Sequence, residues 1–449
     1  MVEMCGPMTP ATVTMGDNSS FQSRMEQDNG AISQCPVMTG MFFARPQCLS
    51  QTPATGLCQR PDASPASASP SAVTVKSSIR PSSRLSALME GLRVPGDSKN
   101  PPVPPMWLDR ELFDRGRKFY EHYLFCLSFS DLLSLVMMLS MDGALRPLIY
   151  TGRSDSPVKA LRRYFSTLLH IITWFKGDVW NPSDAAHKDV LSIRSTHCKL
   201  ACTFNSSTYS EKVRSVTVND KGHEEPQNSL NFTIRQDIQC NVEERLQVDT
   251  SDPPPLLINQ FDMSMTQYSF MGLIVAHPEK MGAGAATEEE FAGLIHFWRG
   301  IGWLLGIEDK YNFCSGTVAE TRELCLEVER LIAIPSLSLV DWNYEHMATS
   351  LITGMSYILP SMSYPAMFRY LAHTIDVSTP AFNSRMSYRH SFHYWVMRAT
   401  FAIIILAPWL VLIFNKMFRT LIHKVQKNSK LRLSMSHHSK PDASPYGET

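Results

Sequence analysis

Apolar residues recur at spacings of three and four along most of the chain between residues 105 and 375, the pattern of amphipathic helices. The clearest case is the stretch 287–314. Its apolar stripe is formed by Phe291, Leu294, Ile295, Trp298, Ile301 and Leu305. Thr287 and Glu290 form a capping box at its start, and three glutamates in the first turn suit the helix dipole. The stretch therefore predicts a helix that anchors the fold, with Gly293 as a point of close backbone approach.

The same period predicts most of the remaining elements. Further helices are expected at 107–123, 157–175, 185–204, 263–282, 318–334, 340–359 and 363–374. The stretch Tyr123–Met141 carries only one charge, at Asp131, and is interpreted as a helix buried in the domain, with a membrane segment as the alternative. Alternating strand patterns and Gly-rich phosphate loops do not stand out, so the predicted fold class is all-α.

Two polar segments interrupt this pattern. Residues 1–100 are rich in Ser, Pro, Thr and Gly and have few large apolar side chains, which predicts a disordered N-terminal region without a signal peptide. Residues 205–255 lack a helical period and are interpreted as a polar insertion loop. The predicted helical domain therefore spans 105–390.

The apolar run at 394–415 predicts a transmembrane helix, because it approaches the length of a bilayer span and has aromatic residues at one end. The alternative is a core helix at the end of the domain. The tail 416–449 is basic before Asp442, which places it in the cytoplasm. The domain would then face a lumen, in agreement with glycosylation sequons at Asn205 and Asn231, and we expect the endoplasmic reticulum membrane.

Composition narrows the functional classes. The formal net charge is zero, from 42 basic and 42 acidic residues, and no basic block with interleaved aromatic residues occurs in the middle of the chain. A nucleic-acid partner is therefore not expected. The ten cysteines are scattered without a CxxC motif, which gives no support for a zinc finger or a dense disulfide framework.

One histidine interrupts an apolar stripe. In the predicted helix at 185–204 the stripe contains Val190, Ile193 and Leu200, and His197 occupies the same face. The pattern alone favours a core histidine that bonds a backbone carbonyl, and a haem or metal ligand is the functional alternative. On the preceding helix, Arg163, Thr167 and His170 share a face, for which a solvated surface is the ordinary interpretation.

Five segments together resemble one family. They are TGR, RRYFST, IRSTHCKL, DMSMTQYSFMGLIVAHPEKMG and HFWRGIGWLLGIEDKYNFC, within about 105–375. This succession is similar to the haem-dependent oxygenases that include the bacterial latex-clearing rubber oxygenases and the enzyme that cleaves the side chain of a mycophenolic acid precursor. The last two segments carry most of the resemblance.

The resemblance implies a globin-like helical bundle around a b-type haem. His197 falls at the position of the axial iron ligand, and Arg163 and Thr167 fall where the family has residues beside the haem. Ser166 stands where the rubber oxygenases have a lysine. Phe270 and Trp298 would belong to an apolar, cofactor-binding pocket. The implied reaction is addition of O2 to a C=C bond of an isoprenoid or other unsaturated lipid-like substrate.

Three hypotheses follow from the sequence. The first is a membrane-anchored haem oxygenase, with Arg163 and Thr167 as catalytic residues. The second is a non-catalytic haem- or lipid-binding membrane protein on the same scaffold, which Ser166 and the polar insertion favour. The third is a membrane protein without a cofactor. Absorption spectra after haem addition distinguish the third from the others, and O2 consumption distinguishes the first from the second.

Overall fold

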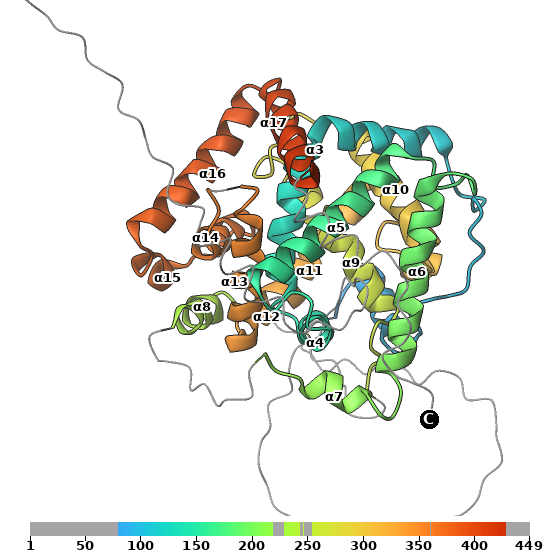
Figure 1. The fold of residues 1–449 in the computed structure, drawn as a ribbon, viewed down its shortest axis with the longest axis horizontal. Coiled ribbons are helices and arrows are strands. Elements are labelled where there is room, and N and C mark those ends of the chain that lie inside the picture. Colours follow the sequence, from blue (N-terminus) through green and yellow to red (C-terminus); the bar gives the residue numbers. More distant parts are fainter. Residues whose placement is uncertain (1–79, 219–228, 243–245, 247–253, 360, 428–449) are drawn as a thin grey trace, which may run out of the picture.

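The predicted fold class is confirmed. The computed structural model describes residues 80–218, 229–242, 246, 254–359 and 361–427, and within these ranges the regular structure is entirely helical (Figure 1). The α-helices are α2 Ser83–Glu90, α3 Arg110–Met138, α4 Asp142–Tyr150, α5 Pro157–Lys176, α6 Ala185–Phe204, α7 Ser210–Ser215, α8 Leu230–Gln239, α9 Gln260–Ala276, α10 Glu288–Leu304, α11 Val318–Val328, α12 Ile334–Leu337, α13 Trp342–Met355, α14 Tyr364–Thr374, α15 Pro380–Ser384, α16 Tyr388–Leu406 and α17 Leu410–Lys427. Short helical turns are η1 Gly91–Arg93, η2 Asp309–Tyr311 and the π-helical η3 Glu329–Ala333.

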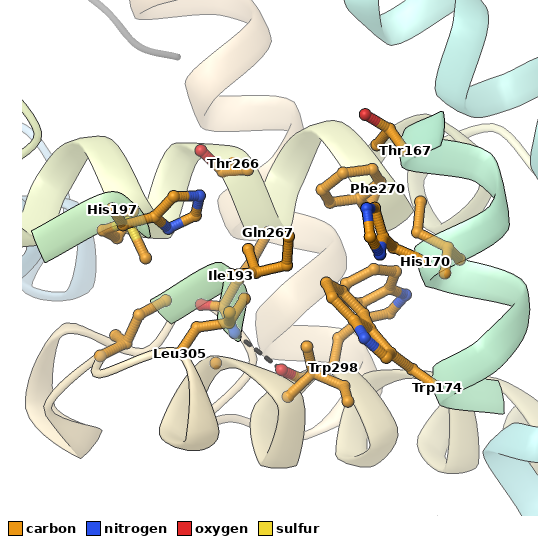
Figure 2. Close-up of a pocket in the computed structure, with 15 residues that line it drawn as sticks. Thr167, His170, Trp174, Ile193, His197, Thr266, Gln267, Phe270, Trp298 and Leu305 are labelled. Atoms are coloured by element: carbon orange, nitrogen blue, oxygen red, sulfur yellow. Dashed lines mark hydrogen bonds between the residues drawn. The ribbon is translucent and has the colours of Figure 1, made fainter. Parts of the chain in front are cut away.

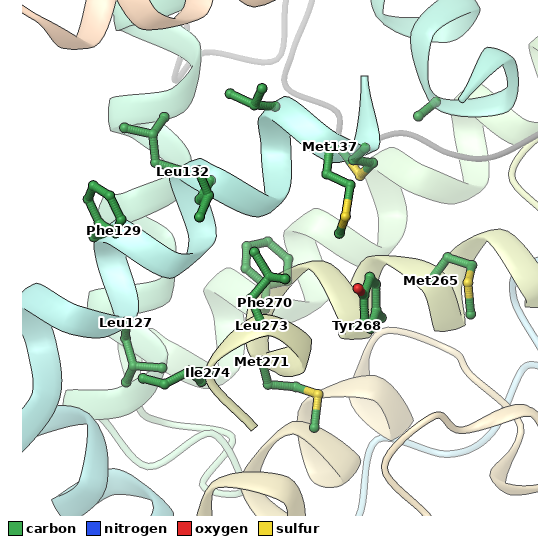
Figure 3. Close-up of a cluster of buried hydrophobic side chains, with 14 of the residues drawn as sticks. Leu127, Phe129, Leu132, Met137, Met265, Tyr268, Phe270, Met271, Leu273 and Ile274 are labelled. Carbon is green, nitrogen blue, oxygen red and sulfur yellow. The ribbon is translucent and has the colours of Figure 1, made fainter. Parts of the chain in front are cut away.

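Helix α9 is the centre of the hydrophobic core. Its residues from Gln260 to Val275 are all buried, and it packs against α3, α10 and α11. Figure 3 shows apolar side chains of α3, such as Phe129 and Leu132, lying opposite Phe270 and Leu273 of α9. Its polar residues are buried as well and form hydrogen bonds inside the core, as Gln260 does with the Gly306 carbonyl oxygen and Gln267 with the Trp298 carbonyl oxygen.

The prediction for the stretch 287–314 is confirmed at its start. Thr287 and Glu290 form the expected capping box on α10, and Thr317 forms a second one with Glu320 on α11. Gly293 of α10 faces Gly116 of α3 so closely that a Cβ atom built on Gly116 would lie 2.3 Å from the Gly293 carbonyl oxygen. The absence of both side chains allows the two backbones to meet.

The predicted boundary of the disordered region at residue 100 is wrong for its last part. Residues 83–93 form α2 and η1, and the buried side chains of Leu85, Leu88, Met89 and Leu92 join the core. Ser82 caps α2 by accepting a hydrogen bond from the Leu85 backbone N–H. The burial of these four apolar side chains stabilises the packing of α2 and η1 against α9, although a long polar segment precedes them. Residues 1–79 lie outside the described part.

The insertion at 205–255 is not a loop throughout, since it contains α7 and α8. Asn231 lies on α8, is fully buried and donates from its side-chain nitrogen to the Asp341 carbonyl oxygen over 2.9 Å. Its side chain is therefore inaccessible to glycosylation in the folded protein. Residues 219–228, 243–245 and 247–253 lie outside the described part.

The C-terminal stretch differs from the expected continuous helix over 394–415. Helix α16 ends at Leu406, the chain turns at Ala407–Trp409, and α17 begins at Leu410. In the described residues, no single helix has both the length and the hydropathy of a membrane span; α3 and α4, bent by 94° relative to each other, meet those criteria only together. The tail predicted at 416–449 is helical to Lys427, and 428–449 lie outside the described part.

Helix α17 packs against α3 at a kink (Figure 1). Tyr123 has non-helical torsion angles inside α3, with φ −113° and ψ 26°. The Asn415 side chain accepts from the Phe125 backbone N–H over 2.9 Å and donates to the His122 carbonyl oxygen over 2.6 Å. An inserted amide that satisfies the freed backbone groups accounts for the kink.

Candidate functional site

A narrow cavity of about 30 Å³ lies between α5, α6, α9 and α10. Figure 2 shows residues from these helices around it, and they come from segments more than 100 residues apart in the chain. Four residues predicted for the site line this cavity: Thr167, His197, Phe270 and Trp298. The helical packing thus brings together residues that the sequence places on four separate elements.

His197 has the most unusual environment in the cavity. Its side chain is 5% exposed, and neither Nδ1 nor Nε2 has a hydrogen-bond partner. Burial lowers the pKa of His197 to about 4, and the nearby charge of Arg163 contributes to the shift. The imidazole is therefore neutral at pH 7 and keeps a free lone pair at the cavity wall.

Another histidine of α6 has the hydrogen bond to a backbone carbonyl that a core histidine ordinarily makes. His187 of α6 is buried, and its Nδ1 lies 2.7 Å from the Val179 carbonyl oxygen. His197 has no such bond. Most buried polar groups in folded proteins are bonded, so the two unbonded nitrogens set His197 apart from His187 and leave the ring available to a ligand.

Arg163 does not belong to the cavity lining but is buried close to it. Its Nη1 donates to the Thr151 hydroxyl over 3.4 Å, while Nη2 is enclosed without a partner. Burial lowers the pKa of the Arg163 guanidinium to about 10, so it keeps its positive charge at neutral pH. The Thr167 hydroxyl donates to the Arg163 carbonyl oxygen over 3.2 Å. The expectation of a solvated face is therefore wrong for Arg163, while Thr167 and His170 are partly exposed.

Two aromatic rings form an apolar wall. Phe270 of α9 and Trp298 of α10 are stacked, with ring centroids 4.7 Å apart and an interplanar angle of 5°. Figure 2 shows the hydrogen bond that holds this contact, in which Gln267 Nε2 donates to the Trp298 carbonyl oxygen over 2.8 Å. The wall is flat and fixed by α9 and α10, which suits a planar or extended apolar ligand.

His170 lines the site, whereas the sequence placed it only on a polar face of its helix. It lines the cavity from α5, and its Nδ1 lies 2.9 Å from Oδ1 of Asp189 on α6. Trp174 Nε1 donates to Oδ2 of the same carboxylate over 2.7 Å. The other ring nitrogen, Nε2, lies 3.4 Å from the Ser166 hydroxyl. An Asp-held imidazole of this kind directs its Nε2 lone pair away from the carboxylate.

A second cavity of about 50 Å³ adjoins the first. The two share the lining residues Thr167, Ile171 and Phe270, and the second extends to Phe418 of α17. Its lining is apolar except for a few polar groups. One of them is Asp131, whose Oδ1 has no hydrogen-bond partner; burial raises the pKa of this carboxyl well above its usual range.

No group of three or more His, Cys, Asp or Glu side chains is placed to hold a bare metal ion in the described part of the chain. A haem iron needs only one protein imidazole, because the porphyrin supplies the other donors. A single unbonded histidine in an apolar cavity fits that requirement.

Comparison with protein-family models, curated proteins and solved structures finds no match to this chain. The assignment of function therefore depends on the residues of the site itself.

Proposed function

We propose that the chain is a haem-dependent oxygenase that adds O2 to a C=C bond of an isoprenoid or other unsaturated lipid-like substrate at a membrane. The observation that carries the proposal is His197, which is buried at the cavity with both ring nitrogens unbonded. A neutral imidazole nitrogen is a good iron ligand.

The donors present suit a b-type haem, and the helices around the cavity of about 30 Å³ would have to separate to admit the macrocycle. His197 would hold the iron, and the stacked Phe270 and Trp298 would lie along the macrocycle or the substrate. The enclosed Nη2 of Arg163 would pair with a propionate, since a buried guanidinium and a carboxylate form a strong charge-assisted bond. When bound, the haem supplies the iron that activates O2.

The chain's own groups would orient the substrate and move a proton. His170 would accept a proton at Nε2, because Asp189 fixes its Nδ1 and stabilises the resulting positive charge. Trp174 holds the Asp189 carboxylate through its indole N–H. The apolar lining would exclude water from the reacting carbon atoms.

The adjoining cavity supports an apolar substrate. It is lined by side chains such as Phe129, Leu132 and Leu168 and reaches the first cavity at Thr167 and Phe270. A long hydrocarbon chain placed there would lose its contact with water, which stabilises binding by about 0.8 kcal/mol for each buried CH2 group.

The alternative is a non-catalytic haem- or lipid-binding membrane protein. Ser166 is the observation that favours it, because a lysine occupies this position in the oxygenases that the chain resembles. Localisation to the endoplasmic reticulum stays a prediction, and the burial of Asn231 removes one of the two sequons that favoured the lumenal side.

O2 uptake by haem-loaded full-length protein tests the proposal. Squalene serves as an unsaturated probe, and the saturated squalane is its matched control. The proposal predicts O2 consumption and carbonyl products with squalene only. Bound haem without O2 uptake across a panel of isoprenoids and polyunsaturated lipids would favour the non-catalytic alternative.

A further inference from the structure

Helices α16 and α17 carry an exposed apolar face. Fourteen large hydrophobic side chains are exposed in the described part of the chain, and nine of them lie between residues 388 and 417. The most exposed of these nine are Tyr388, Phe392, Leu406 and Trp409. A concentration of this kind marks an interaction surface rather than ordinary surface composition.

The same segment is positively charged. Residues 388–427 contain six Lys or Arg residues and no acidic residue. An open groove of about 680 Å³ lies between α3 and α17, where Lys118, Lys416 and Arg419 line it together with His122 and His423. Glu121 is the acidic residue of the groove. Lys118 and Lys416 form no ion pair with any described residue. The groove is therefore suited to a phosphate or carboxylate group.

Helix α17 is held with one side against the domain. Val411, Asn415, Phe418 and Ile422 are buried, whereas Leu412, Ile413 and Met417 point outward. Asn415 fixes this orientation by its two bonds to the backbone of α3. The apolar face therefore lies along the side of the domain, with the basic groove beside it.

We propose that α16 and α17 dock the domain side-on onto an anionic lipid bilayer. Leu412, Ile413 and Trp409 would enter the acyl region, and the phosphate of an anionic lipid would occupy the groove at Lys416 and Arg419. The positive charge of α16 and α17 favours an anionic bilayer over a second copy of the chain. Two copies of this face, which has no acidic residue on the two helices, would repel each other, whereas an anionic lipid surface attracts the face. The docking does not depend on haem.

One consequence rests on the proposed function. Phe418 reaches from the docked helix into the second cavity, which adjoins the cavity at His197. An apolar chain that left the bilayer and passed α17 would meet this apolar lining next to the site. The bilayer would then be the source of the substrate.

Vesicle flotation of haem-free full-length protein tests the docking. Neutral phosphatidylcholine vesicles are compared with vesicles that also contain phosphatidylserine. The double variant W409E/L412E replaces two exposed apolar side chains of the docking face with carboxylates. The double variant K416E/R419E reverses the charge at two positions of the groove. The matched control is L326E on α11, because Leu326 is an exposed leucine outside this face. We expect phosphatidylserine-dependent binding of wild type and L326E, and a loss of roughly 30-fold or more in both double variants.

The binding mode has its own measurement. Side-on docking predicts quenching of Trp409 fluorescence by lipids brominated near the headgroup and release of the protein at high pH. Equal binding of wild type and both double variants would overturn the proposal. A concentration-dependent dimer that W409E/L412E abolishes, without vesicle binding, would identify a second copy as the partner instead. Because haem and O2 are absent, these outcomes are independent of the oxygenase proposal.

Discussion

Nδ1 of His170 and Oδ1 of Asp189 lie 2.9 Å apart, at the wall of the same cavity that contains His197. Trp174 donates to the second oxygen of the carboxylate, so both oxygens have partners. The pair fixes the imidazole tautomer and leaves Nε2 as the proton acceptor. In the proposed function, the pair would give the cavity a base separate from the unbonded ring of His197.

We expect His170→Gln to lower kcat by roughly 100-fold or more while the haem content stays at the wild-type level, because general bases contribute about 10²–10⁴-fold. Asp189→Asn should give a smaller loss. Turnover of haem-loaded variants and their absorbance measure both effects.

His187→Gln is the control on α6, since His187 bonds Val179 and lines neither of the two cavities described here. Added imidazole should partly restore His170→Gly; wild-type turnover in His170→Gln would contradict the assignment.

Arg163→Gln should weaken haem retention by roughly 10- to 100-fold, because a hydrogen bond to a charged group contributes about 1.5–3 kcal/mol. Transfer of haem to apomyoglobin measures the retention. Arg162→Gln is the matched control, since Arg162 is the preceding residue of α5 and lies outside both cavity linings. Equal haem loss from both variants would show that Arg163 does not contact the group.

Gly293→Ala and Gly116→Ala should each destabilise the fold by about 2 kcal/mol or more, because overpacking exceeds the gain in helix propensity. A Cβ on Gly293 would lie 2.7 Å from the Gly116 backbone nitrogen. Urea unfolding measures the loss. Gly284→Ala is the control, since a Cβ there would meet side-chain atoms first, Ile405 Cδ1 at 3.0 Å and Glu279 Cγ at 3.2 Å, and no backbone atom closer than 3.4 Å. Unchanged stability in Gly293→Ala would refute the close approach of α3 and α10.

The local features of this fold were predictable from the sequence. The capping box of Thr287 with Glu290 depends on residues three apart, and the apolar stripe of α10 depends on the helical period. The burial of His197 followed from its stripe in the same way. These features require no knowledge of how the helices pack.

The interhelical features were not predictable. His170 meets Asp189 across two helices, and Asn415 enters α3 from nearly 300 residues away. Their side chains look like ordinary polar surface in the sequence, and only the packing of the helices places them together. The break between α16 and α17 was missed because the apolar run continues through Pro408.

Asp131→Asn should raise the free energy of unfolding more at pH 8 than at pH 5. Burial raises the pKa of Asp131 in the folded state, so the folded protein binds a proton that the unfolded chain releases above about pH 4. The contribution of the Asp131 carboxyl to the free energy of unfolding is therefore greatest at low pH. It is lost as the pH rises toward the pKa of this carboxyl in the folded protein. Urea unfolding of the haem-free protein at both pH values measures it. An equal effect at the two pH values would show that the carboxyl is ionised in the fold.

The absorption spectrum of full-length protein after haem addition tests the central claim most directly. We expect a Soret band in wild type and in His187→Gln, and a shifted or absent band in His197→Ala whose far-UV circular dichroism matches wild type. External imidazole should restore the wild-type band in His197→Ala, because it can fill the space of the deleted ring. A wild-type spectrum in His197→Ala without imidazole, or no haem binding by the wild-type protein, would contradict the account.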